Sequence, residues 1–244
     1  MISIHNLTKN FGRAVAVDHV TLEVPPGEIF GFIGPNGAGK TTTIRMMAGL
    51  LYPSDGTVHI CGVDMIKNPV KAKQRIGLIP DRPYLYEKLT GMEFLRFMGD
   101  MYRVKPADFM QKARDMLAQF SLLDRGNELI EAYSHGMKQR LIMCAALIHD
   151  PDVIIVDEPM VGLDPRGIKM VRELFRIMAG NGRTVFMSTH TLKLAQEICD
   201  RIGIIHQGKL IATGTLMELE EQASMSGSDL ESIFFQLTEP LEPI

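Results

Sequence analysis

The sequence lacks any long apolar run: its longest uninterrupted stretch, 141–148, has only eight residues. A membrane-spanning helix needs about 20, so the sequence predicts that the chain does not cross a bilayer. The first residues, MISIHNLTKN, also lack the basic and long apolar regions of a secretory signal. These two absences predict a cytoplasmic location.

Cysteine is scarce, and its three positions lie too far apart for a disulfide framework or a paired-cysteine zinc site. The seven histidines show no metal-ligand spacing. Neither sign of charge dominates, because 26 basic and 29 acidic side chains give a net charge of −3. A strongly basic nucleic-acid-binding surface is therefore not expected. The hydrophobic fraction of 45% is that of an ordinary globular protein.

Short apolar runs of strand length alternate with longer helix-like stretches, which is typical of an α/β fold. Continuous apolar runs predict parallel strands buried on both faces, whereas polar–apolar alternation predicts antiparallel strands. The parallel candidates are 28–33, 152–156 and 184–188, and the antiparallel candidates are 2–7, 15–24 and 57–61. Residues 202–206 and 209–213 flank Gln207-Gly208, which predicts a hairpin.

Residues from about 83 to 150 have a helical texture, with Met, Leu and Ala at three- and four-residue spacing. This pattern predicts a helical lobe inserted into the α/β core. After about residue 214 we expect a tail, in which the SMSGS stretch is a loop followed by a helix. Ser228 and Glu231 have the spacing of a capping box at the start of that helix. Its apolar face would carry Leu230, Ile233, Phe234 and Leu237.

A phosphate-binding pattern lies between the strand expected at 28–33 and a helix expected from Lys40 to Leu50. Glycines let consecutive backbone N–H groups turn toward an anion, and a helix N-terminus adds partial positive charge. Lys40 can reach the β- and γ-phosphates, and the Thr41 hydroxyl can hold Mg²⁺. An ordinary glycine-rich turn would not explain the whole pattern, so the sequence predicts binding of a nucleoside triphosphate. The candidate binding residues are Gly34, Pro35, Asn36, Gly37, Ala38, Gly39, Lys40, Thr41 and Thr42.

Two carboxylates, Asp157 and Glu158, follow the apolar run that begins at residue 152. The spacing allows this strand to be the neighbour of strand 28–33 in a parallel sheet. Asp157 would then reach the Mg²⁺ shell, and Glu158 could orient or deprotonate an attacking water. Taken alone, a solvated Asp-Glu pair at a strand end is an equally good interpretation. The phosphate-binding pattern favours the catalytic one.

Three further motifs follow in order: YSHGMKQR at 133–140, GLDP at 162–165 and STH at 188–190. With the two motifs above, they resemble the ATP-binding-cassette (ABC) transporter ATPases over residues 1 to about 215. The resemblance implies ATP and Mg²⁺ as ligands. It also implies a phosphate-loop NTPase core with a mainly parallel sheet, an antiparallel β subdomain and an inserted helical subdomain. Residues 1–218 would form the nucleotide-binding domain and 219–244 a C-terminal tail with a short helix.

The resemblance also implies roles for individual residues. Phe11 stands where the family stacks an aromatic ring on adenine. Ser134 and Gly136 resemble the signature residues that bind the γ-phosphate of ATP held by the other protomer. Asp164 resembles the D-loop aspartate, and His190 the switch histidine near the γ-phosphate and water. Singly, Phe11 would more often be a core residue and His190 a hydrogen-bonded polar group.

The sequence departs from the family pattern at three positions. His135 replaces a glycine and Met137 a glutamine of the usual signature, Leu-Ser-Gly-Gly-Gln. Asp81 stands at the place of the loop glutamine. Its carboxylate could bind Mg²⁺, and it adds negative charge beside Asp157 and Glu158. We therefore expect hydrolysis to depend more on Mg²⁺ than in a glutamine version.

The first functional hypothesis is an ATP-binding and ATP-hydrolysing subunit that energises a membrane exporter, with Glu158, His190 and Lys40 as catalytic residues. Residues 229–238 and 84–91 resemble segments of exporter-type cassettes that partner separately encoded transmembrane permease subunits, although 84–86 would equally suit simple packing within the lobe. The resemblance implies a homodimer formed on ATP binding. It also implies a peripheral position on the inner face of the cell membrane, and no nucleic acid partner.

Two other hypotheses remain open. A soluble ABC ATPase acting on ribosomes or nucleic acid is disfavoured by the single cassette, by the lack of a basic excess, and by the 94 residues between Lys40 and Ser134, which leave no room for a long coiled coil. A non-hydrolysing nucleotide-binding scaffold is disfavoured by the presence of Glu158 and His190.

Overall fold

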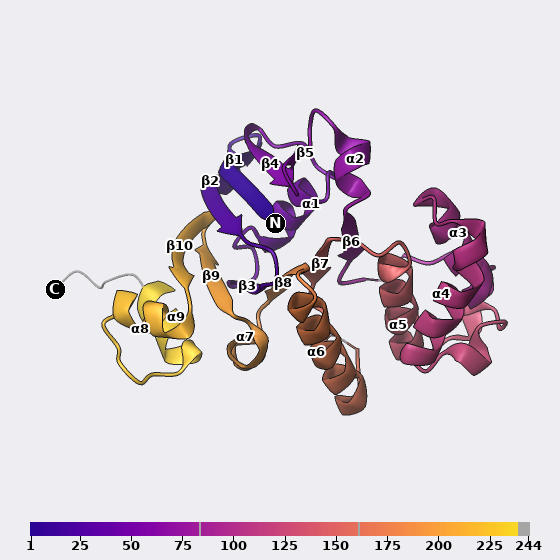
Figure 1. The fold of residues 1–244 in the computed structure, drawn as a ribbon. Coiled ribbons are helices and arrows are strands. Elements are labelled where there is room, and N and C mark those ends of the chain that lie inside the picture. Colours follow the sequence, from indigo (N-terminus) through magenta and orange to yellow (C-terminus); the bar gives the residue numbers. More distant parts are fainter. Residues whose placement is uncertain (83, 161, 239–244) are drawn as a thin grey trace.

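The computed structural model describes residues 1–82, 84–160 and 162–238, which form two β-sheets and the helices packed on them (Figure 1). The larger sheet has the strand order β10-β9-β3-β8-β7-β6, and its neighbours pair in parallel except for β10 with β9. Its strands are β3 Ile29–Ile33, β6 Ile76–Ile79, β7 Val153–Asp157, β8 Thr184–Thr189, β9 Arg201–His206 and β10 Lys209–Gly214.

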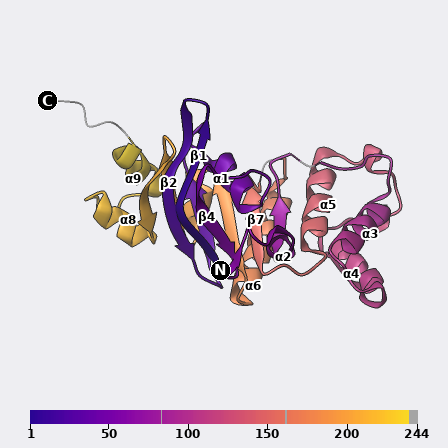
Figure 2. The same ribbon diagram turned by 90° about the horizontal axis from the view of Figure 1, so that it is seen from above.

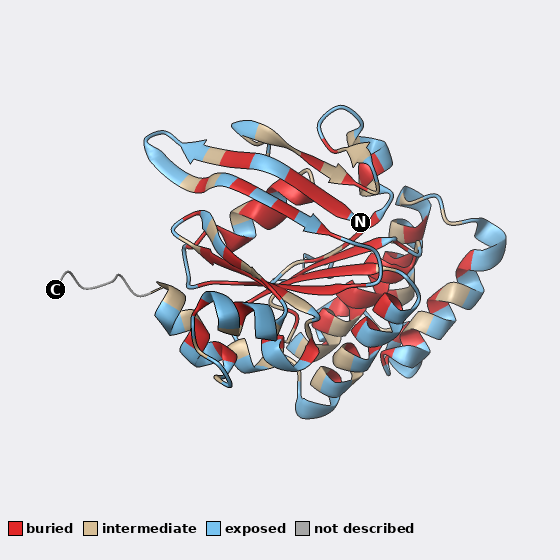
Figure 3. Ribbon diagram, turned by 60° about the vertical axis from the view of Figure 1, so that its left-hand side comes forward, coloured by how far each residue is buried: buried red, intermediate tan, exposed pale blue. Residues whose placement is uncertain are grey.

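The smaller sheet is antiparallel and has the order β2-β1-β4-β5. It contains β1 Ile2–Phe11, β2 Ala14–Val24, β4 Asp55–Ile60 and β5 Val63–Asp64. The parallel and antiparallel strand assignments from the sequence are therefore confirmed. Every residue of β3, β7 and β8 is buried, which explains why these strands are almost continuously apolar (Figure 3).

One expectation about the sheet is wrong. The strand that carries Asp157, β7, is not the neighbour of β3, because β8 lies between them and pairs with both. Sequence spacing shows that two segments can meet at one edge of a sheet, but it does not determine how many strands separate them.

Helix α1, Lys40–Met47, packs between the two sheets, where its Ile44 and Met47 share one apolar cluster with Ile2 of the small sheet and Phe30 of the large sheet. The helix ends three residues earlier than expected. Ala48 is its C-cap and Gly49 has a positive φ of 64°, a conformation in which glycine commonly ends a helix. The opposite face of the large sheet is covered by α6, Pro165–Gly180, and α7, Leu192–Ile198 (Figure 3).

A group of helices extends beyond β6, next to α2, Pro69–Lys73 (Figures 1 and 2). Its α5 contacts both β6 and the other two long helices. The group consists of α3 Gly91–Met101, α4 Pro106–Gln119, the short 3₁₀ helices η1 Leu123–Arg125 and η2 Ile130–Ala132, and α5 His135–Leu147. No helix in the part of the chain that the structure describes is both long and apolar enough to span a membrane.

The end of the chain forms two helices on the far side of the large sheet: α8, Leu216–Gln222, and α9, Leu230–Thr238 (Figure 1). The sequence predicted α9 but not α8. Leu230 and Ile233 are fully buried against residues of β9, β10 and α7. The predicted capping box of Ser228 and Glu231 is wrong: α9 starts one residue later, and the Asp229 carboxylate accepts the hydrogen bond of Ser232 N at 2.9 Å.

Candidate active site

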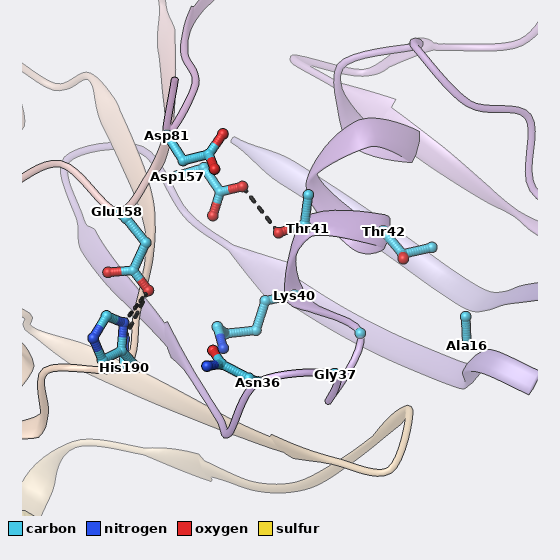
Figure 4. A pocket seen from close by; sticks show the side chains of 11 residues that line it. Ala16, Asn36, Gly37, Lys40, Thr41, Thr42, Asp81, Asp157, Glu158 and His190 are labelled. Carbon is cyan, nitrogen blue, oxygen red and sulfur yellow. Dashed lines mark hydrogen bonds and ion pairs between the residues drawn. The ribbon is translucent and has the colours of Figure 1, made fainter. Parts of the chain in front are cut away.

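A pocket of about 320 Å³ opens where β6, β7 and β8 end, opposite the loop that joins β3 to α1 (Figure 4). It brings together most of the residues predicted for phosphate and metal binding and for catalysis. The residues that line it are Ala16, Asn36, Gly37, Gly39, Lys40, Thr41, Thr42, Asp81, Asp157, Glu158 and His190. The predicted residues outside this lining are Phe11, Gly34, Pro35, Ala38, Ser134 and Gly136.

The loop from β3 to α1 is packed against the β9–β10 hairpin. A Cβ on Gly34 would lie 2.3 Å from the carbonyl oxygen of Ile205, so only glycine fits there. The Gly208 N–H of the hairpin turn donates to the Ala38 carbonyl at 2.9 Å. These contacts hold Gly34 and Ala38 against the hairpin, while Asn36, Gly37 and Gly39 of the same loop line the pocket.

Lys40 is the first residue of α1, and its side chain is buried. Its ammonium donates to the carbonyl oxygens of Gly34 at 2.6 Å and Pro35 at 3.0 Å. Burial lowers the pKa of Lys40, and the nearby carboxylates of Glu158 and Asp157 oppose that shift. The site therefore contains a positive charge held by the loop itself, at the N-terminus of a helix, as an anion site requires.

Asp157 is buried at the end of β7. One of its carboxylate oxygens accepts the Thr41 hydroxyl at 3.0 Å (Figure 4). The other accepts the Ser188 hydroxyl. A hydroxyl and a carboxylate are the hard oxygen donors that Mg²⁺ prefers, and this ion commonly takes one or two protein ligands together with phosphate oxygens. The described residues contain no cluster of three or more His, Cys, Asp or Glu that could hold a metal. The donor set therefore fits Mg²⁺ bound jointly with a phosphate.

Glu158 follows β7 with a positive φ of 52°. Its carboxylate accepts three hydrogen bonds: from the Thr189 hydroxyl at 3.1 Å, from His190 N at 3.0 Å and from His190 Nδ1 at 2.7 Å. Because Nδ1 carries the donated proton, the neutral ring leaves Nε2 as an acceptor. The end of β8 thus orients the carboxylate toward Lys40 and the loop (Figure 4).

Asp81 lies two residues beyond β6, with its side chain beside that of Asp157 (Figure 4). It is exposed, and one carboxylate oxygen accepts Arg82 N at 2.8 Å. The structure thus places this departure from the family pattern at the pocket; its role toward Mg²⁺ stays a prediction.

Phe11, at the end of β1, is not a core residue, because 54% of it is exposed. The Lys9 ammonium lies 5.3 Å from the centre of its ring. The neighbouring strand β2 supplies Ala16 to the pocket. An exposed aromatic ring at this edge is compatible with stacking on a base, which stays a prediction.

Ser134 and Gly136 lie at the start of α5, away from the pocket of their own chain. The Ser134 hydroxyl caps the helix by accepting Met137 N at 3.3 Å. Asp164 likewise caps a helix: its carboxylate accepts Gly167 N at 2.8 Å at the start of α6. The structure therefore separates the signature residues from the phosphate loop of the same chain.

Ser188 and Thr189 were missed as individual site residues, although the sequence analysis noted the motif they belong to. They hold the carboxylates of Asp157 and Glu158, respectively. Two hydroxyl residues at the end of a buried strand, followed directly by a histidine, were the signal. Polar side chains in such a place need partners, and the paired strand β7 supplies them.

Comparison with known proteins identifies a family for this chain. The model of the ABC transporter family matches residues 17–161. The linearmycin resistance ATP-binding protein LnrL of Bacillus subtilis (strain 168) is 39% identical over 90% of this chain and 70% of its own length. The Nod factor export ATP-binding protein I of Cupriavidus metallidurans is 35% identical over 99% of this chain and 79% of its own.

A solved structure described as the ATP-binding subunit of an ABC transporter superposes with a TM-score of 0.94. It is 32% identical and covers 98% of this chain and 100% of its own. Family model, relatives and solved structure thus agree on the family. The chain belongs to the ABC transporter family and is an ATPase subunit that energises a membrane transporter.

Proposed function

We propose that two copies of this chain bind and hydrolyse Mg-ATP and thereby drive export through separately encoded transmembrane permease subunits. The observation that carries the catalytic part is the oriented Glu158 carboxylate, held by Thr189 and His190 in the same pocket as Lys40. A carboxylate that is fixed in this way and faces a phosphate loop suits activation of water. A scaffold that only binds nucleotide would need no such arrangement.

Each residue of the pocket has a distinct role in this proposal. Glu158 orients the water and draws its proton, and His190, near the γ-phosphate, accepts a hydrogen bond from that water at Nε2. Lys40 neutralises charge that develops on the phosphate oxygens, in a site where charge stabilisation supplies most of the catalysis. Thr41 and Asp157 would hold Mg²⁺, with Asp81 close by; the ion supplies charge neutralisation of the phosphates. Residues 34–42 bind the phosphates, and Phe11 stacks on the adenine.

The signature residues support the dimer in this proposal. Ser134 is exposed at the N-terminus of α5, outside the pocket of its own chain. A helix N-terminus binds anions well, and the Ser134 hydroxyl can still donate its proton while it accepts Met137 N, so a second copy that presents ATP to it would complete the site. We propose that ATP binding joins two copies, each of which supplies Ser134 and Gly136 to the γ-phosphate held by the other.

A groove between α2, α3 and the start of α5 supports the proposal of a membrane partner. Its volume is about 870 Å³, and Tyr84, Leu85 and Tyr86 line it together with apolar residues of α3. Tyr84 is 77% exposed and Tyr86 is 60% exposed. Exposed aromatic residues around an apolar groove mark an interaction surface. We propose that a permease segment docks there, which would place this chain on the inner face of the cell membrane.

The direction of transport rests on the relatives, whose names include export of Nod factor and resistance to linearmycin. We further propose that residues 1–218 form the working nucleotide-binding domain and 219–244 a tail that packs on its edge through α9.

The test compares ATP turnover and ATP-dependent dimer formation for the wild type and Glu158→Gln. We expect the variant to lose turnover and to accumulate as an ATP-bound dimer, because binding is kept while the carboxylate is lost. Glu173→Gln is a matched control, since this glutamate lies on the exposed surface of α6 far from the pocket lining. Turnover that persists in Glu158→Gln would refute the catalytic role. Recovery of the chain with ribosomes rather than with membrane subunits would favour the alternative of a soluble cassette.

A further inference from the structure

One wall of the groove described above is the segment that contains Tyr84 to Glu87. The chain that continues from it is hydrogen-bonded to residues 129–131, which lead into the signature residues Ser134 and Gly136. Glu131 N donates to the Glu87 carbonyl at 3.1 Å, and Ile130 N donates to the Leu89 carbonyl at 2.9 Å. Thr90 and Leu129 form an antiparallel bridge in the same place. Segment 87–90 is therefore paired with segment 129–131, which ends three residues before Ser134.

A side-chain ion pair makes a second connection, directly to the signature helix. The Lys138 ammonium lies 2.5 Å from a carboxylate oxygen of Glu87; the Lys138 side chain is only 22% exposed and that of Glu87 is 56% exposed. Lys138 belongs to the first turn of α5, because its N–H donates to the Ser134 carbonyl at 2.9 Å. This pair with Lys138 keeps the pKa of Glu87 below its ordinary value. Both residues line the groove.

The neighbouring ion pair differs in the respects that matter. Lys88 pairs with Glu131 at 2.6 Å, but the Lys88 side chain is 84% exposed. It also joins two segments that backbone hydrogen bonds already hold together. An ion pair as exposed as this one contributes little. The pair of Glu87 with Lys138 instead fixes the first turn of α5, where Ser134 and Gly136 lie, to the groove wall.

We propose that Glu87 and Lys138 are positioning residues for the ATP-bound dimer: they hold the signature at the start of α5 in place through the wall of the groove. The inference rests on the proposed function, because it requires that Ser134 and Gly136 meet ATP held by a second copy. A displacement of the groove wall would then shift the signature and change how readily two copies close on ATP. Nucleotide binding by a single copy does not involve these residues, so it should be unaffected.

The test uses the Glu158→Gln background, so that ATP is not consumed, and measures two quantities. The first is the affinity of the monomer for a fluorescent ATP analogue at low protein concentration. The second is the ATP concentration for half-maximal dimer formation, followed by sedimentation. We expect Lys138→Met to raise that concentration about fivefold or more. The monomer affinity should stay within about twofold.

Two further variants distinguish positioning from simple support of the fold. The exchange Glu87→Lys with Lys138→Glu should restore dimer formation, because it rebuilds the pair and a carboxylate is well tolerated at a helix N-terminus. Lys88→Met, the matched control, should behave like the parent.

The proposal is overturned if Lys138→Met dimerises like the parent, or if its monomer affinity for the ATP analogue falls as much as its dimer formation does. It is also overturned if the double exchange does not restore dimer formation. A Glu158→Gln parent that never dimerises with ATP would overturn the proposed function itself, and this inference with it.

Discussion

His149 makes stability depend on pH, and the structure gives the sign and size of the effect. The ring follows α5 and stacks on Tyr102 with centroids 3.7 Å apart. Its Nε2 donates to the Ile76 carbonyl at 3.0 Å, while Nδ1 is buried and has no partner among the described residues. Protonation would place a charge and an unpaired donor there. Burial accordingly lowers the pKa of His149 from 6.5 to about 4.

The unfolded chain therefore binds this proton more readily than the folded chain does. The contribution of the neutral ring to the free energy of unfolding is fully present above about pH 6.5 and is lost as the pH falls toward 4. A pKa shift of this size lowers the free energy of unfolding by about 2 kcal/mol when the pH falls from 8 to 5. Because the ring is partly exposed, we expect about half of that.

His149→Phe tests this, since phenylalanine keeps the stacking on Tyr102 but cannot be protonated. At about pH 8 the variant should be less stable by about 1 kcal/mol, because the hydrogen bond to Ile76 is lost. At about pH 5 the difference should shrink to near zero, because the wild type alone loses the contribution of a neutral ring. Urea unfolding followed by circular dichroism at both pH values measures this. Parallel pH profiles for the two proteins would refute the reasoning, since every other titrating group is common to both.

Three further predictions concern the pocket and the tail. Gly34→Ala should abolish binding of a fluorescent ATP analogue, because its Cβ would lie 2.3 Å from the Ile205 carbonyl and push the phosphate loop out of place; normal affinity would contradict this close packing. Asp81→Gln should make the rate of ATP hydrolysis less dependent on Mg²⁺ concentration, because the carboxylate beside Asp157 is removed; an unchanged Mg²⁺ titration would rule out the assigned role. Asp229→Ala should lower the free energy of unfolding by about 1 kcal/mol by removing the cap on Ser232 N, as measured by urea denaturation; no loss would mean that the cap does not stabilise α9.

The strands and their direction could be predicted from the sequence because burial on one face or two leaves a pattern in each strand. The position of β8 between β3 and β7 could not be predicted. Strand order depends on how the helices pack across the sheet, and the sequence of a single segment does not determine it. Helix α8 was missed for a similar reason. It is short, and of the seven residues from Leu216 to Gln222 only Leu219 is buried, too few for a recognisable periodicity.

In the pocket, the motifs predicted Lys40, Thr41, Asp157, Glu158 and His190, and the structure gathers all five around one cavity. Short motifs suffice there because backbone geometry around a phosphate tolerates few residue types. The motif at 188–190 indicated that Ser188 and Thr189 need polar partners, but not which ones, because they meet the two carboxylates only when β8 pairs with β7. The part that depends on local backbone geometry was predictable, and the part that depends on strand pairing was not.

Glu158 also illustrates a conflict between stability and the catalytic role proposed for it. Its φ of 52° lies in the left-handed region, which costs a residue other than glycine about 1 kcal/mol. Glycine would remove that strain and would also remove the carboxylate that Thr189 and His190 orient. The residue type that best suits this backbone conformation is therefore not the one that the proposed water activation requires. A copy of this gene released from selection for ATP turnover should lose its activity early at this position, while it still folds well.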